Sequence, residues 1–211
     1  MKKYKFKSRL FGFSLLLLFG LILVLFFVAI NKLNQGTKVK EVIDGDTIIL
    51  ASGQAVRYIG IDTPEKSQPF YREAKEFNRK MVGGRNVVLE FDVESQDKYG
   101  RLLAYVYVND TLVNAEFLKN GLALIYTYPP NVRYVNLFLG LEKEAQKKNL
   151  GIWSLPSPKP EEYYVGSLKS RRFHRPKCPY AENIASQNLM RFQTRQQALD
   201  IGYSPCRSCK P

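Results

Sequence analysis

The sequence predicts an α+β protein: a small five-stranded β-barrel, closed or nearly closed, with about three helices. One transmembrane helix precedes this barrel, and a small α+β module follows it. Three observations support this prediction: an uncharged apolar run over residues 10–30, short β-branched runs alternating with helical segments over 37–153, and all Cys and His in residues 174–209. A content of 45% hydrophobic and 24% charged residues excludes wholesale disorder and collagen-like structure.

The N-terminus has the pattern of a membrane anchor. Five basic residues within positions 2–9 precede the uncharged run Leu10–Ile30. A helix of that length measures about 31 Å, enough to cross a hydrocarbon core of about 30 Å. Signal peptides have shorter apolar regions, and Phe27 makes a poor cleavage context before Ala29. We therefore expect residues 1–36 to be an uncleaved anchor and tether that places the rest outside the cytoplasm; secretion after signal cleavage is the alternative.

Residues 37–153 have the pattern of the barrel domain. Expected strands, separated by turn residues, are Val42–Ile43, Ile48–Leu50, Val56–Ile61, Asn86–Val93, Leu102–Val108 and Leu122–Tyr126. Expected helices are Arg72–Val82, Val113–Asn120 and Tyr134–Lys148. Several other α+β folds share this periodicity. A Pro-rich linker at 154–162 then leads to a separate module at 163–211.

The net charge of +13 is unevenly distributed. The barrel domain is close to neutral, whereas residues 1–36 contain no acidic side chain and residues 154–211 carry a net charge of +6. A basic tail beside a balanced domain indicates contact with a polyanion, although charge that serves only solubility is the alternative.

Two acidic segments have the chemistry of a metal site. Asp44-Gly45-Asp46-Thr47 places two carboxylates around a glycine, and Asp62-Thr63-Pro64-Glu65 adds two more beyond Arg57. Oxygen ligands suit Ca²⁺ or Mg²⁺, and a spare carboxylate can orient or deprotonate a water molecule. Taken alone, the first segment is better explained as a hairpin turn, and the second is equally well explained as a surface loop with salt bridges.

A third segment, Asp97-Lys98-Tyr99-Gly100-Arg101, places an arginine at the start of a strand. A guanidinium there can bind two phosphate oxygens at once. Alone, this segment is as well explained by a solvated hairpin.

Together the three segments resemble the staphylococcal-nuclease-like (thermonuclease) family in order and spacing. The resemblance covers about residues 37–153 and includes Val42-Ile43 before the first segment and the closing Asn149-Leu150-Gly151-Ile152-Trp153. It implies an OB-type five-stranded barrel with three helices. It also implies calcium-dependent hydrolysis of phosphodiester bonds in DNA and RNA.

The resemblance further implies roles for individual residues. The Ca²⁺ ligands would be the carboxylates of Asp46 and Asp62 and the main-chain carbonyl of Thr63, supported from outside by Asp44. Glu65 would position or deprotonate the attacking water. Arg57 and Arg101 would bind the scissile phosphate and neutralise charge in the transition state.

Substrate contacts also carry over from the resemblance. Tyr126 and Tyr128 match tyrosines that contact the nucleotide, and Lys98 and Tyr99 match positions beside the terminal phosphate. Products with 3′-phosphates are implied. Stacking tolerates any base, which predicts little sequence specificity, although packing at the barrel edge would also explain the two tyrosines. The stretch between Glu65 and Arg72 is shorter than in the family's best-known secreted member and lacks its lysine-rich loop.

The C-terminal module has the ligand spacing of a zinc site. His174-x₃-Cys178 and Cys206-x₂-Cys209 supply two pairs of N and S ligands. A disulfide between Cys206 and Cys209 is the competing interpretation. A segment this short has little core of its own, and a metal would stabilise it.

The module also resembles the metal-binding module of the bacterial alkylation-repair protein Ada, on segments around Tyr164, His174 and Gly202. A His stands here in place of the first of four Cys, so methyl-transfer chemistry is not implied. Several basic residues form a candidate grip on the DNA backbone, with a folded cap as the alternative: Arg171, Arg172, Arg175, Lys177, Arg191, Arg195 and Arg207.

Two functions follow for the chain as a whole. The first is a membrane-tethered calcium-dependent nuclease, and the second is a non-catalytic nucleic-acid-binding protein on the same barrel. The acidic and arginine positions are all present, which favours the enzyme.

Overall fold

The computed structural model describes residues 36–211. The expected transmembrane helix at Leu10–Ile30 lies outside the described residues. Within residues 36–211, no helix combines the length and the apolar character needed to cross a membrane.

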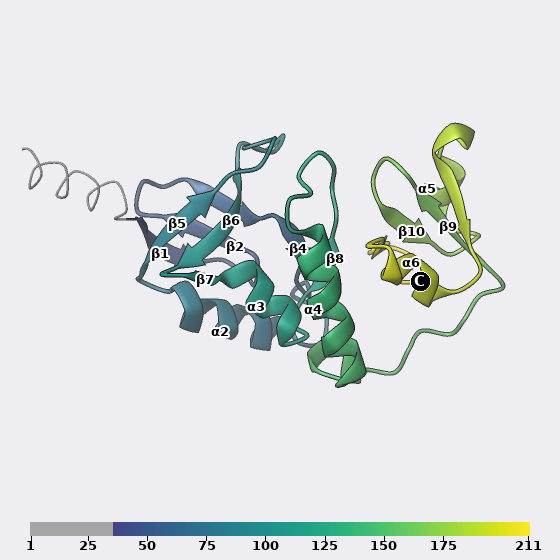
Figure 1. The fold of residues 1–211 in the computed structure, drawn as a ribbon, viewed down its shortest axis with the longest axis horizontal. Helices are drawn as coiled ribbons and strands as arrows, with labels where there is room; N and C mark the ends of the chain where they lie inside the picture. The colour runs from purple at the N-terminus through teal and green to yellow at the C-terminus, as the bar shows by residue number, and fades with distance from the viewer. Residues whose placement is uncertain (1–35) are drawn as a thin grey trace, which may run out of the picture. The chain divides into compact units, whose positions relative to one another are not determined.

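Five strands close into a barrel, as the sequence predicts (Figure 1). They are β1 (Thr37–Val42), β2 (Thr47–Leu50), β3 (Ala55–Tyr58), β5 (Asn86–Glu90) and β6 (Leu102–Val108). The order is β3-β2-β1-β5-β6, and parallel pairing of β3 with β6, Val56 opposite Leu102, closes the ring. The short strand β7 (Thr111–Leu112) extends β6 as a hairpin. This closed barrel with helices is consistent with an OB-type fold.

The alternation of the strands fills the barrel with aliphatic and aromatic side chains. In β1 the buried residues are Val39 and Val42, three positions apart, because the pairing with β2 shifts register between Val39 and Glu41. Ile48 and Val56 are fully buried on the neighbouring strands. Burial of this apolar surface is the main force that closes the barrel.

Three helices pack on the barrel, with bounds within a residue or two of those expected. They are α2 (Tyr71–Val82), α3 (Val113–Lys119) and α4 (Val135–Lys147). Phe77 of α2 meets Phe117 of α3 edge to face, with ring centroids 5.0 Å apart. Both helices therefore bury one apolar face in the same core.

The expected strand Val56–Ile61 is wrong as a single element. The chain breaks after Tyr58, and a separate strand β4 (Gly60–Asp62) pairs with β8 (Leu124–Tyr126) outside the barrel. Gly60 has φ +79°, and a Cβ there would lie 2.6 Å from the Phe138 ring. Only glycine fits this turn, and the turn carries Asp62 away from the barrel wall.

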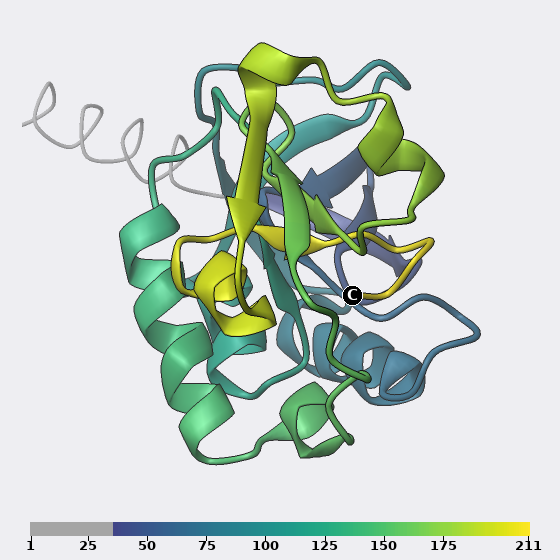
Figure 2. The ribbon, with the colours of Figure 1, turned by 90° about the vertical axis from the view of Figure 1, so that its right-hand side faces the viewer.

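The C-terminal module is a four-stranded sheet with short helices, the α+β architecture expected (Figure 2). Its order is β11-β9-β10-β12, with β9 (Tyr164–Ser167), β10 (Arg172–His174), β11 (Leu189–Phe192) and β12 (Ser204–Pro205). The helical segments are η1 (Gly151–Ser154) before the linker and α5 (Pro179–Glu182), η2 (Ser186–Asn188) and α6 (Arg195–Asp200) within the module. Thr194 and Gln197 form a capping box that starts α6.

Residues 37–211 form one compact unit in which this module packs against the barrel domain. The buried Ser204 hydroxyl of β12 donates a hydrogen bond to the Ile125 carbonyl of β8. Gln196 of α6 donates to Gln146 of α4 over 3.0 Å. Trp153, at the end of the barrel domain, packs against the module's aromatic cluster. These contacts hold β12 beside β8, close to the end of β4.

Candidate functional site

A buried carboxylate stands where the hairpin between β1 and β2 meets the end of β4. Asp46 is 5% exposed, and its Oδ2 accepts hydrogen bonds of 2.9 Å from both the amide and the hydroxyl of Thr63. The Asp46 amide donates to Asp44 Oδ1 over 3.1 Å. A Cβ at Gly45 would lie 2.7 Å from the Thr63 side chain. The Asp44-Gly45-Asp46 segment is therefore both a turn and half of a carboxylate site.

Arg57 joins the two acidic segments. Its Nε lies 3.1 Å from Asp46 Oδ1, and its Nη2 lies 3.2 Å from Asp62 Oδ1. The Nη2 group also donates to the Ile61 carbonyl over 2.9 Å. Pairing of Thr47 with Arg57 across β2 and β3 places the guanidinium here, and the side chain is only 11% exposed. Two buried carboxylates thus share one cation.

The electrostatics of this cluster favour a further positive charge. Burial raises the pKa of Asp46, and the neighbouring acids Asp44 and Asp62 add to the rise, whereas Arg57 opposes it. Carboxylate oxygens are the donors that Ca²⁺ prefers, and Asp46 and Asp62 supply them, although Arg57 and Arg207 pair with these oxygens in the structure. The chemistry of the donor set therefore fits the ion that the sequence predicts.

Glu65 follows Asp62 by three residues, in the loop after β4, and its side chain is half exposed. Its amide donates to Gln68 Oε1 over 2.8 Å, which fixes the start of this loop. Its carboxylate forms an ion pair with Arg207 of the C-terminal module. The same guanidinium also binds Asp62, through Nε to Oδ2 at 3.0 Å and through Nη2 to Oδ1. Glu65 and Asp62 are therefore bridged by an arginine from 145 residues away.

The Arg101 side chain pairs with Asp97, in the loop that precedes β6. Its Nε and Nη2 lie 2.8 and 2.7 Å from Asp97 Oδ2, and the pairing holds the pKa of Asp97 below its ordinary value against the effect of burial. Arg101 nevertheless lines the same cavity as Arg57, a space of about 460 Å³. The other residues predicted to contact substrate line that cavity too: Lys98, Tyr99, Tyr126 and Tyr128.

The aromatic side chains of this cavity differ in exposure. Tyr99 is 73% exposed, with the Lys98 ammonium 5.0 Å from its ring centroid. Tyr128 is 49% exposed, and its ring centroid lies 6.0 Å from that of half-buried Tyr126. Arg172 of β10 covers the Tyr126 ring at 4.4 Å. Tyr128 is therefore the ring most free to stack on a base, because cations lie over the rings of Tyr99 and Tyr126.

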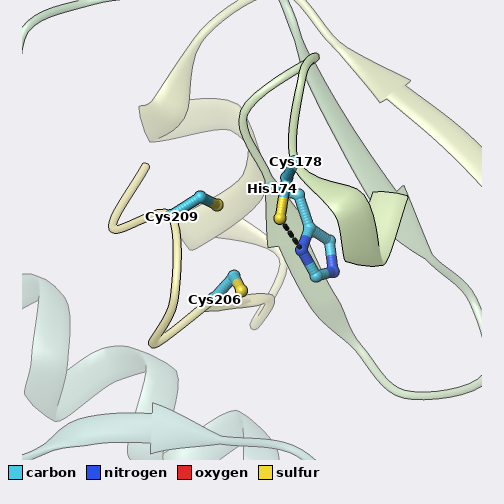
Figure 3. Close-up of side chains that lie close together, drawn as sticks. All are labelled: His174, Cys178, Cys206 and Cys209. Atoms are coloured by element: carbon cyan, nitrogen blue, oxygen red, sulfur yellow. Dashed lines mark hydrogen bonds between the residues drawn. The ribbon is translucent and has the colours of Figure 1, made fainter. Parts of the chain in front are cut away.

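The four residues predicted to bind zinc converge in the C-terminal module (Figure 3). Their ligand atoms all lie within 4.8 Å of one another, and the three thiols are free rather than paired as disulfides. His174 ends β10 and its Nδ1 lies 3.4 Å from Cys178 Sγ, while Cys206 and Cys209 share the loop after β12. Zn–S bonds of about 2.3 Å in a tetrahedron need sulfurs about 3.8 Å apart, which this cluster reaches with small movements.

The surroundings of the cluster suit zinc. Burial lowers the pKa of His174, which keeps the imidazole neutral as a ligand must be. Burial raises the pKa of the Cys209 thiol to about 12, so its thiolate requires a nearby cation. The Arg175 amide donates to Cys209 Sγ over 3.3 Å, the kind of outer hydrogen bond that orients a metal ligand.

Comparison with known proteins agrees with both parts of the molecule. The family described as "Staphylococcal nuclease homologue" matches residues 55–155, and "Metal binding domain of Ada" matches residues 158–211. The chain is 47% identical to a thermonuclease of Staphylococcus intermedius over 124 residues, covering 54% of this chain and 74% of the relative. The chain belongs to the staphylococcal nuclease family.

Two further relatives carry the same kind of name. A thermonuclease of Staphylococcus hyicus is 40% identical over 133 residues, which are 59% of this chain and 79% of that protein. Endonuclease YncB of Bacillus subtilis is 44% identical over 123 residues, 53% of this chain and 58% of the relative. The chain is therefore a nuclease acting on nucleic acid, and the resemblances to this family and to the Ada module are confirmed.

Several of the basic residues expected to grip DNA also contact the protein itself, and DNA binding by this module stays a prediction. Arg175 donates to the Cys209 carbonyl over 3.0 Å, and Arg195 donates to the Pro211 carbonyl over 2.9 Å. Arg191 stacks on Tyr163 at 3.8 Å. Arg172 and Arg207 face the nuclease carboxylates instead. The contact of Arg207 with Asp62 and Glu65 was not expected from the sequence; its only local signal is its position between two zinc ligands.

Proposed function

We propose that this nuclease is a Ca²⁺-dependent phosphodiesterase that cleaves DNA or RNA with little sequence specificity and leaves 3′-phosphate ends. One observation carries the proposal: buried Asp46 and Asp62 share the guanidinium of Arg57 beside a cavity that Arg101 also lines. Hard oxygen ligands and two arginines are the groups that a phosphodiester needs, because it is an anion that repels hydroxide.

The Ca²⁺ ligands in this proposal are the carboxylates of Asp46 and Asp62 and the carbonyl of Thr63. Asp44 supports them by accepting the Asp46 amide, which fixes the orientation of the turn. When bound, the ion supplies positive charge to a phosphate oxygen and so lowers the barrier to nucleophilic attack.

The remaining chemistry belongs to the protein's own side chains. Glu65 accepts a proton from the attacking water, whose oxygen bonds to phosphorus while the P–O5′ bond breaks and the departing O5′ takes a proton from solvent. Arg57 and Arg101 bind the equatorial oxygens and neutralise the charge that grows there. When substrate enters, the Arg101 guanidinium leaves the Asp97 carboxylate and binds the phosphate instead.

Binding of the polymer falls to the cavity walls. Tyr126 and Tyr128 contact the nucleotide, and Lys98 and Tyr99 lie beside its terminal phosphate. Base stacking accepts every base, so sequence preference is weak. Residues 1–36 tether the enzyme to the membrane with this cavity on the extracytoplasmic side, or are removed on secretion, so the substrate is nucleic acid outside the cytoplasm.

A cleavage assay tests the proposal with the full chain. Supercoiled plasmid and a single-stranded RNA are incubated with enzyme in Ca²⁺ or in EGTA, and product ends are analysed. We expect cleavage only with Ca²⁺. Glu65→Gln should lower turnover roughly 10²–10⁴-fold, the range for a general base.

The matched control is Glu73→Gln, which changes an exposed glutamate of α2 outside the cavity. This variant should cleave like the parent chain. Cleavage that persists in EGTA, or equal turnover in Glu65→Gln and Glu73→Gln, would contradict the proposal.

A further inference from the structure

Arg207 comes from the zinc-binding loop but sits at the carboxylates of the nuclease site. It lies between the ligands Cys206 and Cys209. Its Nε is 3.0 Å from Asp62 Oδ2, its Nη2 binds Asp62 Oδ1, and its Nη1 binds Glu65 Oε1. One guanidinium therefore holds the proposed metal ligand and the proposed general base together.

The rest of the interface holds Arg207 in this place. Ser204, three residues before it, is buried and hydrogen-bonded to Ile125 of β8. Arg172 lies over the Tyr126 ring, and its Nη2 is 3.9 Å from Asp62 Oδ2. The contact is therefore part of a packed interface and not an isolated surface pair.

A guanidinium and a calcium ion need the same oxygens. Asp62 has two carboxylate oxygens, and Arg207 binds both, while Arg57 also lies 3.2 Å from Oδ1. A Ca²⁺ ion would require direct contacts of about 2.3–2.6 Å to those oxygens. A Ca²⁺ ion on Asp62 would therefore compete with Arg207, because both need these oxygens and their charges repel at short range.

We propose that Arg207 sets the calcium affinity of the nuclease site by occupying Asp62 and Glu65 in place of the ion. This inference rests on the proposed function, since it assumes that Asp62 is a calcium ligand. The zinc-binding module then acts on the nuclease site through one side chain, which must leave before Ca²⁺ binds and before Glu65 can accept a proton.

The structure provides room for that movement. Arg207 lines a cavity of about 250 Å³ together with Asp62 and Thr63. It also lines a separate open cavity of about 510 Å³ within the module, beside Lys169 and Ser170. We expect the Arg207 side chain to move from the first cavity to the second when Ca²⁺ binds, which would free the two acids.

Calorimetric titration of Ca²⁺ into the zinc-loaded full chain tests the inference. We expect Arg207→Ala to bind Ca²⁺ roughly 10–100-fold more tightly than the parent chain, the range of one charge-assisted hydrogen-bonded pair. Arg207→Lys keeps the charge but loses the two-pronged contact and should fall between the two. The matched control is Arg79→Ala, which removes an exposed arginine that pairs with Glu76 on α2.

The outcomes separate this inference from the proposed function. Zinc content and thermal unfolding are measured for every variant, and Arg207→Lys replaces Arg207→Ala in the test if the alanine variant loses zinc. Equal or weaker Ca²⁺ binding on loss of Arg207, with binding intact in the control, overturns the inference alone. Tighter binding without any cleavage supports the inference and overturns the proposed function. Absence of Ca²⁺ binding in every variant overturns both.

Discussion

The nuclease site and the zinc site are assembled in opposite ways. The proposed nuclease site gathers Asp46 from the turn between β1 and β2, Arg57 from β3 and Asp62 from the end of β4, so it exists only once the barrel has closed. The zinc site takes its ligands from the end of β10, the turn after it and the loop after β12, in a module whose own core is small. The first site depends on its fold, whereas the second supplies much of the stability of its fold.

Removal of a zinc ligand should have the largest effect and tests this difference between the two sites. Cys178→Ser should abolish zinc binding and unfold the module, because zinc contributes about 10–16 kcal/mol in small zinc domains. The barrel, with its separate core, should keep its helices and strands. Metal analysis and circular dichroism measure both effects. A variant that kept the module folded without zinc would show that packing against the barrel suffices.

Substitution of the two proposed catalytic arginines should lower turnover similarly but stability unequally. Arg57→Ala leaves Asp46 buried without its cationic partner, while Asp62 keeps Arg207, and should lower the free energy of unfolding by about 3–5 kcal/mol. Arg101→Ala breaks a more exposed pair and should cost about 1 kcal/mol or less. Each should lower turnover roughly 10²–10³-fold. Denaturant unfolding beside Ca²⁺-dependent cleavage checks this; equal loss of stability in both variants would contradict it.

A buried acid near the interface should make stability depend on pH. Burial of Glu142, which accepts the Ile125 amide, raises its pKa from 4.5 to about 7. The folded chain therefore holds more protons than the unfolded chain between those values, and its stability falls as pH rises through that range. As pH rises from 4.5 to 8, the free energy of unfolding of Glu142→Gln should increase relative to that of the parent chain, by up to about 3 kcal/mol.

Exposed Glu144, on the same helix, provides the control for this pH effect. Glu144→Gln should follow the parent chain at every pH. Denaturant unfolding from pH 4.5 to 8 gives the comparison. A constant difference between Glu142→Gln and the parent chain across that range would refute the explanation.

The smallest expected effect concerns substrate stacking. Tyr128→Ala should weaken the binding free energy of the substrate by about 1–3 kcal/mol, which appears as a higher KM. It should leave kcat nearly unchanged, because stacking stabilises the bound substrate and the transition state equally. Tyr180→Ala, an exposed tyrosine outside the nuclease cavity, is the control. Steady-state kinetics on single-stranded DNA measures both. A fall in kcat without a change in KM would place Tyr128 in the chemical step instead.

Much of the fold could be predicted from the sequence because its signals are local. Glycines after α2 and α3 end those helices, and alternating residues reveal β6. The break at Ile59 was missed because an apolar run conceals it, although Gly60 was the available sign. The break depends on Phe138, a contact from a distant helix that local periodicity does not contain.

The features of the candidate sites can likewise be separated into those with a local sequence signal and those that depend on tertiary packing. The zinc ligands occur at short, diagnostic spacings, and the acidic segments carry a family pattern, so both could be proposed from residues alone. The pairing of Arg101 with Asp97 depends on a side-chain conformation, and the contact of Arg207 with Asp62 depends on how the module packs on the barrel. Local spacing alone does not reveal either contact.

A crystal structure of the zinc-loaded protein with Ca²⁺ and a nucleotide tests the central claim most directly. The account predicts one calcium ion about 2.3–2.6 Å from carboxylate oxygens of both Asp46 and Asp62, with phosphate between Arg57 and Arg101. A calcium ion bound elsewhere, or a nucleotide phosphate that contacts neither arginine, would contradict it.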